Sequence, residues 1–457
     1  MTALAALGDF VAARVRGSLT PDIQELLRLH VIDTAAAWIA GSKTDEARKL
    51  AAYRDELARD MPGVLSEITI NCALVRLTEV DDIHIASMTT PSAFIVPAAL
   101  SIAAAQPQAD AQAFGEAMLA GYEVMVRLGT AIDGPMVLYR GIWPSYFSSA
   151  FGVAAVAARL MDLSPQQAAN ALALALNLSG PGVGQHGAPT TSRWLAAGAA
   201  ARNGLLAAHA AKAGFTADTG ILDGKYLAGV LNITPDLESL TAGLGEPPKL
   251  AEIAFKPWCA ARQTMAATQA FAEIIAREIA VAKITAVEAA VPPPMLRMID
   301  HDIVEGDRLS RLTSLPYQIA AVAHAPDLAF DVAASAKVPP AVQAFMPKVK
   351  VTADEALSEG FPSVWRARVR VEADDTWHEH QLAQIPGDPG RPFTRAEVSA
   401  KFHRLVDGII GAARIDRIIG EAVDVVDGRC VPKQFLASIA SALTSPMIAV
   451  RRVALDS

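Results

Sequence analysis

Three polar islands interrupt the apolar stretches of this 457-residue chain, and their side chains are of the kinds that move protons and bind anions. The first island, residues 79–84, holds Asp81, Asp82 and His84, and Thr90 follows shortly after it. A carboxylate beside an imidazole can orient the ring as a general base. Either aspartate could instead cap the end of a helix, and spacing alone does not separate the two interpretations.

The second and third islands add cations and a phenol. The second island, residues 255–262, sets Lys256 and Arg262 among apolar groups. This favours an anion-binding site, with a surface loop as the alternative. The third island, residues 314–317, places Tyr317 in the first turn of an expected helix, where the helix dipole could ease ionisation of the phenol. Simple packing of the tyrosine is the alternative.

Two other patterns support weaker hypotheses. Residues 182–187 match G-x-G-x-x-G, but a helix is expected before them and Pro189 follows, so a loop between helices is favoured over nucleotide binding. His378 and His380 share one face of an expected strand, yet they lack a nearby third ligand for a metal. A solvated strand edge is the favoured interpretation. We expect no cofactor and no metal ion.

Composition excludes several classes of partner. Lys and Arg number 40 against 48 Asp and Glu, a net charge of −8, so a nucleic-acid partner is not expected. The three cysteines are far apart in the sequence, which fits a reducing compartment and neither a disulfide framework nor a cysteine metal site. The N-terminal residues lack the basic-then-apolar order of a signal peptide, and prolines interrupt the long uncharged stretches. We expect a cytoplasmic protein with no membrane partner.

The elements that must position these islands are mostly helices up to about residue 280. Thr20-Pro21 and Ser164-Pro165 are typical helix starts, each with a capping hydroxyl before a proline. Alanine- and leucine-rich segments predict further helices at 112–132, 146–161, 193–213 and 262–280. The segment 146–161 is apolar on nearly all faces, so we expect it to be buried at the centre of a bundle.

The periodicity changes after about residue 283. Segments rich in β-branched residues predict strands at 284–291, 348–352 and 365–373, and a helix is expected from about residue 315. A capping box at Thr394 opens another helix. The expected fold is mostly α: a discontinuous helical domain of residues 1–280 plus 405–457, with a smaller α+β domain of residues 281–404 inserted.

Taken in order, the islands resemble the MmgE/PrpD family, whose members include 2-methylcitrate dehydratase, cis-aconitate decarboxylase and iminodisuccinate epimerase. The family stretch N-G-x-x-x-H-A-x-D-[FY]-D-D-T-H, followed by H-P-S, is similar to residues 71–84 and 90–92. FKPW (255–258) and SLPYQIA (314–320) also resemble family segments, and the resemblance covers nearly the whole chain.

The resemblance implies a set of site residues with four substitutions, two of which are Ile83 in place of threonine and Glu79 in place of aspartate. Thr90 and Trp143 stand where the family has histidines, which should disable the usual dehydratase or decarboxylase mechanism unless other groups take over. Arg193 stands where the family usually has lysine, so an anion-binding role could survive with different geometry. The resemblance further implies catalytic roles for His84, Lys256, Tyr317 and Asp82, and substrate-binding roles for Arg193, Arg262, Asp81, Thr90 and Trp143.

The resulting hypothesis is a cofactor-independent lyase or isomerase that acts on a small di- or tricarboxylate by abstracting a proton α to a carboxylate. The alternative is a non-catalytic paralogue that binds a ligand or pairs with an active subunit, and the substituted histidines favour it. The resemblance also implies a homodimer.

Overall fold

Helices begin at the residues where the sequence predicts helix starts, and each of these starts has a capping side chain. The computed structural model describes residues 1–13, 19–106, 110–180, 190–277 and 279–444. The hydroxyls of Thr20, Ser164 and Thr394 each accept the backbone N–H three residues later, and the last two form complete capping boxes. Each expected helix start is therefore confirmed.

Helices fill most of the chain as far as residue 275. The first ten are α1 (Ala3–Ala12), α2 (Pro21–Gly41), α3 (Asp45–Asp60), α4 (Val64–Arg76), α5 (Ser92–Ala104), α6 (Ala111–Ala131), α7 (Gly134–Leu138), α8 (Pro144–Leu160), α9 (Pro165–Asn177) and α10 (Ser192–Lys212). They are followed by α11 (Tyr226–Leu231), α12 (Leu237–Thr241), the 3-10 helix η1 (Lys249–Glu252) and α13 (Arg262–Ile275).

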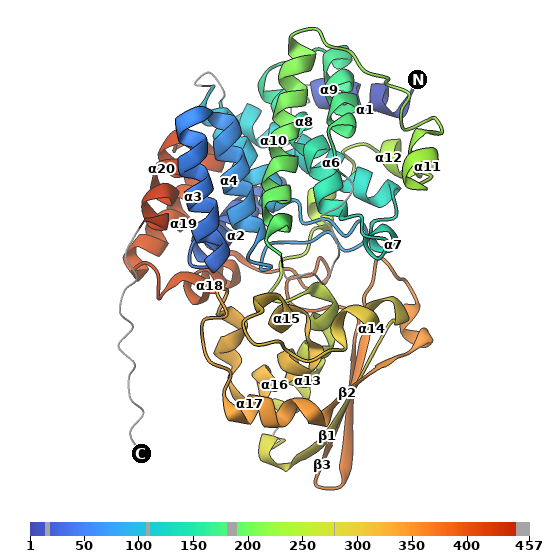
Figure 1. The fold of residues 1–457 in the computed structure, drawn as a ribbon, viewed down its shortest axis with the longest axis vertical. Helices are drawn as coiled ribbons and strands as arrows, with labels where there is room; N and C mark the ends of the chain where they lie inside the picture. Colours follow the sequence, from blue (N-terminus) through green and yellow to red (C-terminus); the bar gives the residue numbers. More distant parts are fainter. Residues whose placement is uncertain (14–18, 107–109, 181–189, 278, 445–457) are drawn as a thin grey trace.

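The central helix of the bundle is α8. Every residue of α8 is buried, and α5, α6, α9 and α10 pack around it. An apolar helix surrounded in this way has no face left for solvent. The expectation of a buried helix over 146–161 is confirmed, and α1–α12 together form what we call the helical lobe, the upper part of Figure 1.

The remaining chain forms a mixed four-stranded sheet with short helices around it, followed by three helices, α18 to α20, that pack on α2 and α5 of the helical lobe. The elements are β1 (Ile284–Val291), α14 (Pro293–Ile299), α15 (Arg308–Thr313), α16 (Leu315–His324), α17 (Pro340–Phe345), β2 (Val349–Ala353), β3 (Ala367–Ala373), β4 (Thr376–Leu382), α18 (Arg395–Val406), α19 (Ala412–Asp427) and α20 (Pro432–Leu443). We call the part from α13 to β4 the sheet lobe; it is the lower part of Figure 1.

Strand order in the sheet is β2-β1-β3-β4, with β1 parallel to β2 and the other neighbours antiparallel. Buried and partly exposed residues alternate along β3, as expected for a strand with one covered face. All three expected strands are present. β4, which carries His378 and His380, is an edge strand, in agreement with the favoured interpretation of that segment.

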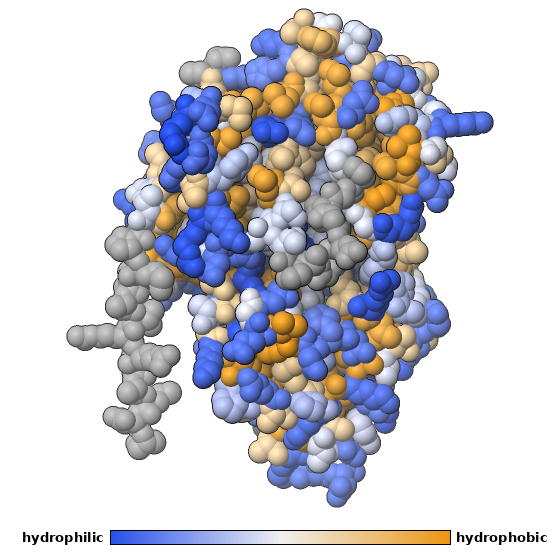
Figure 2. Space-filling view, in the orientation of Figure 1, coloured by the Kyte–Doolittle hydropathy of each residue, from blue (hydrophilic) through white to orange (hydrophobic). Residues whose placement is uncertain are grey.

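Two helices near the expected domain boundaries pack against the other domain than the one in which those boundaries place them. α13, which lies before residue 280, packs against α16, β3 and β4. α18, most of which lies before residue 405, packs against α2 of the helical lobe. Across both lobes, hydrophilic and apolar side chains are interspersed on the face shown in Figure 2. Among the described residues, no helix is long and apolar enough to cross a membrane.

Candidate active site

A cavity of about 1130 Å³ lies between the two lobes, where the helical lobe faces the segment 297–313. Its volume lies slightly above the range of about 300–1,000 Å³ that is typical of small-molecule sites. Its charged lining is mainly cationic: Arg76, Arg140, Arg193, Lys256, Arg262 and Arg297 against Glu79 and Asp307. The cavity is therefore electropositive in a chain whose net charge is −8.

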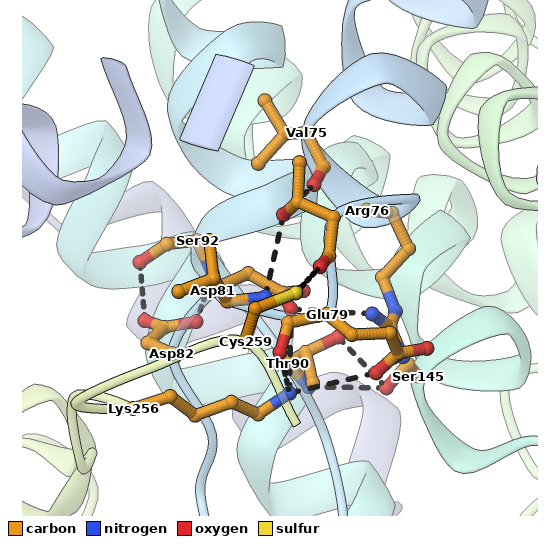
Figure 3. Close-up of polar contacts among 12 residues, drawn as sticks. Val75, Arg76, Glu79, Asp81, Asp82, Thr90, Ser92, Ser145, Lys256 and Cys259 are labelled. Atoms are coloured by element: carbon orange, nitrogen blue, oxygen red, sulfur yellow. Dashed lines mark hydrogen bonds and ion pairs between the residues drawn. The ribbon is translucent and has the colours of Figure 1, made fainter. Parts of the chain in front are cut away.

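A backbone bridge brings the first and second islands together. Ile83 and Ala254 exchange two hydrogen bonds, with N–O distances of 2.9 and 2.8 Å. This pairing places the residue after Phe255 beside the end of α4. As a result, the Lys256 side chain extends toward Glu79 and Thr90, as Figure 3 shows.

A buried charge cluster forms the floor of the cavity. Lys256 is 2% exposed, and its Nζ lies 3.5 Å from Glu79 Oε2 and 3.4 Å from Asp81 Oδ1. Arg76 reaches the same two carboxylates, at 3.0 Å from Glu79 and 3.2 Å from Asp81. Two cations thus face two carboxylates in a region that excludes water, so the cluster is balanced in charge.

The two carboxylates of this cluster respond differently to burial. Desolvation raises the pKa of Asp81 despite the attraction of Arg76 and Lys256. Desolvation also acts on Glu79, but the combined attraction of Arg76, Lys256 and Arg193 outweighs it and lowers the pKa of Glu79. Glu79 holds a left-handed φ of 57°, a strained conformation for a residue with a side chain, and its carbonyl accepts a hydrogen bond from Lys256.

Arg193 is a buried cation of a different kind. Its guanidinium carbon lies 4.2 Å from the ring centre of Trp143 and 4.9 Å from that of Trp194, and Trp143 stacks in turn on Tyr146. Arg193 is 9% exposed and forms no ion pair with any carboxylate in the described parts of the chain, and its Nε has no hydrogen-bond partner there. A buried cation without a counter-charge is costly unless an anion binds to it.

Arg262 also lines the cavity, but it has a counter-ion. Its Nη2 lies 2.9 and 2.8 Å from the two carboxylate oxygens of Asp388, in the loop after β4. Its Nε and Nη1 are buried without partners in the described structure. Both Lys256 and Arg262 are 2% exposed, so the alternative interpretation of the second island as a surface loop is wrong.

Five of the expected site residues line this one cavity: Thr90, Trp143, Arg193, Lys256 and Arg262. The Thr90 backbone N–H donates to Ser145 Oγ at 3.0 Å, which holds the two hydroxyls side by side. Asp81 does not itself line the cavity, but its carboxylate pairs with Arg76 and Lys256, which do.

His84 is not among the residues that line the cavity. The backbone N–H of Ser87 donates to its Nδ1 at 3.1 Å, and its Nε2 lies 3.1 Å from Glu252 of η1. Nδ1 therefore helps to close the turn 84–89, and Nε2 ties that turn to η1, so both ring nitrogens are engaged. The expected catalytic role of His84 has no support from its position, because a proton carrier needs reach to the ligand.

Asp82 takes the capping role that spacing could not separate from the catalytic one. One of its oxygens accepts the Ser92 backbone N–H at 3.0 Å, at the first residue of α5. The carboxylate also contacts an imidazole, but that of His30 on α2 at 3.0 Å rather than that of His84. Asp82 is fully buried and does not line the cavity, so it fixes the start of α5.

Tyr317 is likewise absent from the cavity lining. It lies in the first turn of α16 as expected, but burial raises the pKa of its phenol, with only partial opposition from Arg311. The expectation of eased ionisation is wrong, because burial disfavours the charged phenolate.

The structure adds residues that sequence reasoning did not assign to the site. Arg76 pairs with both floor carboxylates, and its position as a lone cation in the apolar helix α4 was an available signal. Ser145 and His301 also line the cavity, and of the described lining residues His301 alone has an imidazole. The glycine motif 182–187 lies outside the described residues. Those residues contain no cluster of three or more groups able to hold a metal ion.

These observations define a mostly helical protein with a cationic cavity between a helical lobe and a lobe built on a mixed sheet. Residues 5–238 match the MmgE/PrpD N-terminal domain, and residues 258–425 match the MmgE/PrpD C-terminal domain. The chain belongs to the MmgE/PrpD family, whose members are dehydratases, decarboxylases and epimerases that act on carboxylates. The chain has no significant match among curated proteins.

Proposed function

We propose that this chain is a cofactor-independent lyase or isomerase that acts on a small di- or tricarboxylate by abstracting a proton α to a carboxylate. The single observation that carries the proposal is Arg193, a buried guanidinium without a carboxylate partner in the described structure, which faces the same cavity as Lys256. Trp143 and Trp194 hold its planar fork in one orientation, and that fork matches a carboxylate in two parallel hydrogen bonds.

The floor supplies the groups for proton transfer. Glu79 is the carboxylate that lines the cavity beside Lys256, so we assign it as the base. Arg193 is one of the three cations that lower the pKa of Glu79, and a substrate carboxylate bound to Arg193 would offset that cation. Substrate binding would therefore raise the basicity of Glu79. Lys256 would stabilise the enolate-like charge that develops when the proton leaves.

Exchange of an α-proton is the step that this arrangement supports best. Dehydration also requires protonation of a departing hydroxide, and Thr90 and Trp143 replace the two imidazoles that would assist it. We expect deuterium from heavy water to appear in a bound dicarboxylate more readily than cis-aconitate or 2-methyl-cis-aconitate is hydrated. Ready turnover of 2-methylcitrate would reverse this order and refute the assignment.

Glu79→Gln tests the role of the base directly. It should lower deuterium exchange by at least 10²-fold, the usual contribution of a positioned base, while the acid still binds. Glu238→Gln, a change of the same kind on α12 away from the cavity lining, is the matched control. Full exchange in Glu79→Gln would show that another group is the base.

A second candidate, a non-catalytic ligand-binding paralogue or partner of an active subunit, is favoured by the pairing of Lys256. Its ammonium is held by two carboxylates, so it is poorly placed to act as a base. Binding without exchange or turnover, over a panel of citrate-like and succinate-like acids, would support this candidate over the enzyme.

A further inference from the structure

The deep end of the cavity has one buried cation without a counter-ion among the described residues, so it can bind one substrate carboxylate. Arg76 and Lys256 are balanced by Glu79 and Asp81, and Arg262 is balanced by Asp388. Of the buried cations that line the described cavity, only Arg193 has no carboxylate partner. The other lining cations, Arg140 and Arg297, are exposed. A second carboxylate would therefore meet them only at the rim, where ion pairs contribute little.

Apolar side chains line the same cavity from both lobes, and we call them together the apolar wall. Met88, Leu138 and Leu312 are buried along the cavity, at 8, 5 and 5% exposure. Leu309, partly buried, and Val304, 61% exposed, continue the wall toward the sheet lobe. The sheet-lobe part of this wall is the segment 297–313, which lies in Figure 1 around α14 and α15, opposite α7, the helix that carries Leu138.

Polar groups on the same wall are already satisfied by their neighbours. His301 Nε2 lies 3.0 Å from Thr313 Oγ1, and its Nδ1 lies 2.8 Å from the Asp302 carbonyl oxygen. Ser310 Oγ accepts from the Val304 backbone N–H at 2.8 Å and donates to the Asp307 carbonyl at 2.7 Å. These polar groups of the segment 301–313 are thus already paired, so this side of the cavity offers a ligand mainly apolar contact, which suits a hydrocarbon. The Nε and Nη1 of Arg262, which are unpaired in the described structure, belong to α13.

We infer that the ligand is a carboxylic acid with an apolar substituent of several carbons, whose carboxylate binds Arg193 and whose substituent lies on the wall formed by Met88, Leu138, Val304, Leu309 and Leu312. This inference rests on the proposed function and narrows its substrate class. A cavity of about 1130 Å³ accommodates such a substituent, and the wall is the part of the lining that a compact polar acid would not use.

A homologous series of acids tests the inference by calorimetric binding to the full chain. Succinate, 2-methylsuccinate and 2-butylsuccinate present the same two carboxylates with an increasing apolar substituent, and citrate is the compact hydroxytriacid for comparison. Each buried methylene strengthens binding about fourfold, so 2-butylsuccinate should bind at least tenfold more tightly than 2-methylsuccinate and more tightly than citrate.

Two matched variants locate the substituent. Val304→Asp puts a charge on the exposed end of the wall and should lower the butyl-to-methyl affinity ratio at least threefold. Val230→Asp is the control, because Val230 is 62% exposed on α11 and does not line the cavity. Both positions are exposed, so neither change threatens the fold.

The outcomes separate this inference from the proposed function. The inference is overturned if acids bind through Arg193 with no dependence of affinity on chain length. It is also overturned if Val304→Asp leaves the butyl-to-methyl affinity ratio unchanged. Neither result contradicts the proposed carboxylate site. Equal binding of the neutral diamide of 2-butylsuccinate, or no binding by any acid, overturns the proposed function itself.

Discussion

Removing Lys256 should destabilise the fold much more than removing Arg193, although both are buried cations of one cavity. In Lys256→Met, Glu79 and Asp81 keep only Arg76 as a counter-charge. Breaking a buried pair by removing one partner costs about 3–5 kcal/mol, because the other charge stays buried. The variant should therefore be strongly destabilised even in the absence of a ligand.

In Arg193→Met no carboxylate of the described structure loses a partner. The guanidinium gives up its contacts with Trp143 and Trp194, about 0.5–2 kcal/mol each, but the desolvation cost of an unpaired buried charge, several kcal/mol, disappears as well. These effects nearly cancel, so the free energy of unfolding should change by no more than about 1 kcal/mol.

Thermal unfolding resolves this difference. An unfolding entropy of about 2.1 cal/mol/K per residue gives roughly 1 kcal/mol/K for a chain of this length, so Tm should fall about 3–5 °C in Lys256→Met and about 1 °C or less in Arg193→Met. A binding acid at 100 times its Kd adds about 2.7 kcal/mol, or roughly 3 °C, to the native chain. Arg193→Met should lose that gain completely.

Equal destabilisation of the two variants would refute the reasoning, because it would show that Arg193 is as well paired as Lys256. A full ligand-induced shift in Arg193→Met would show that carboxylates bind elsewhere. Arg277→Met, which removes a cation beyond the end of α13 and outside the cavity lining, controls for the loss of a positive charge.

Four further predictions concern packing, capping, pH and assembly. Gly198→Ala should lower Tm by about 1–3 °C, because a Cβ there would lie 1.9 Å from the Thr69 carbonyl oxygen where α10 crosses α4, whereas Gly229→Ala, with open space around it, should not. Asp82→Ala should cost about 1–3 kcal/mol for each buried group it leaves unpaired, measured by urea unfolding. Desolvation raises the pKa of Glu252, but hydrogen bonds from His84 and Lys249 outweigh it and lower this pKa to about 2. The Glu252 carboxylate therefore stabilises the fold at pH values above its ordinary pKa of 4.5, and this contribution is lost as the pH falls toward 2. Glu252→Gln should weaken the dependence of Tm on acid pH. Light scattering at micromolar protein should give the mass of a homodimer, and a monomeric mass would contradict the family expectation.

Local interactions explain why much of the fold was predictable. The Thr394 cap depends only on its own helix, since its hydroxyl accepts the backbone N–H three residues later. The strand β1 matches the expected segment 284–291 because the spacing of β-branched residues is also a local property. The motif order was informative about the family, which the matches to both domains confirm. Of the nine residues that the resemblance assigned to the site, five line one cavity: Thr90, Trp143, Arg193, Lys256 and Arg262.

The roles of the first and third islands depended on partners far away in the sequence. His84 is held by Glu252, 168 residues later, and Asp82 pairs with His30 on α2 instead of with its near neighbour His84. Tyr317 is buried by its surroundings to an extent that its place in a first turn does not reveal. Sequence spacing shows which side chains are close along the chain, but not what is packed against them.

By itself, the sequence determined the family, the mostly helical fold, the helix starts and the set of residues that a carboxylate site would draw on. Only the tertiary structure decided which of those residues face the cavity and which charges are already paired. The reason is that burial and ion pairing are long-range: Arg262 meets Asp388 across 126 residues and Lys256 meets Asp81 across 175, while Arg193 meets no carboxylate in the described structure.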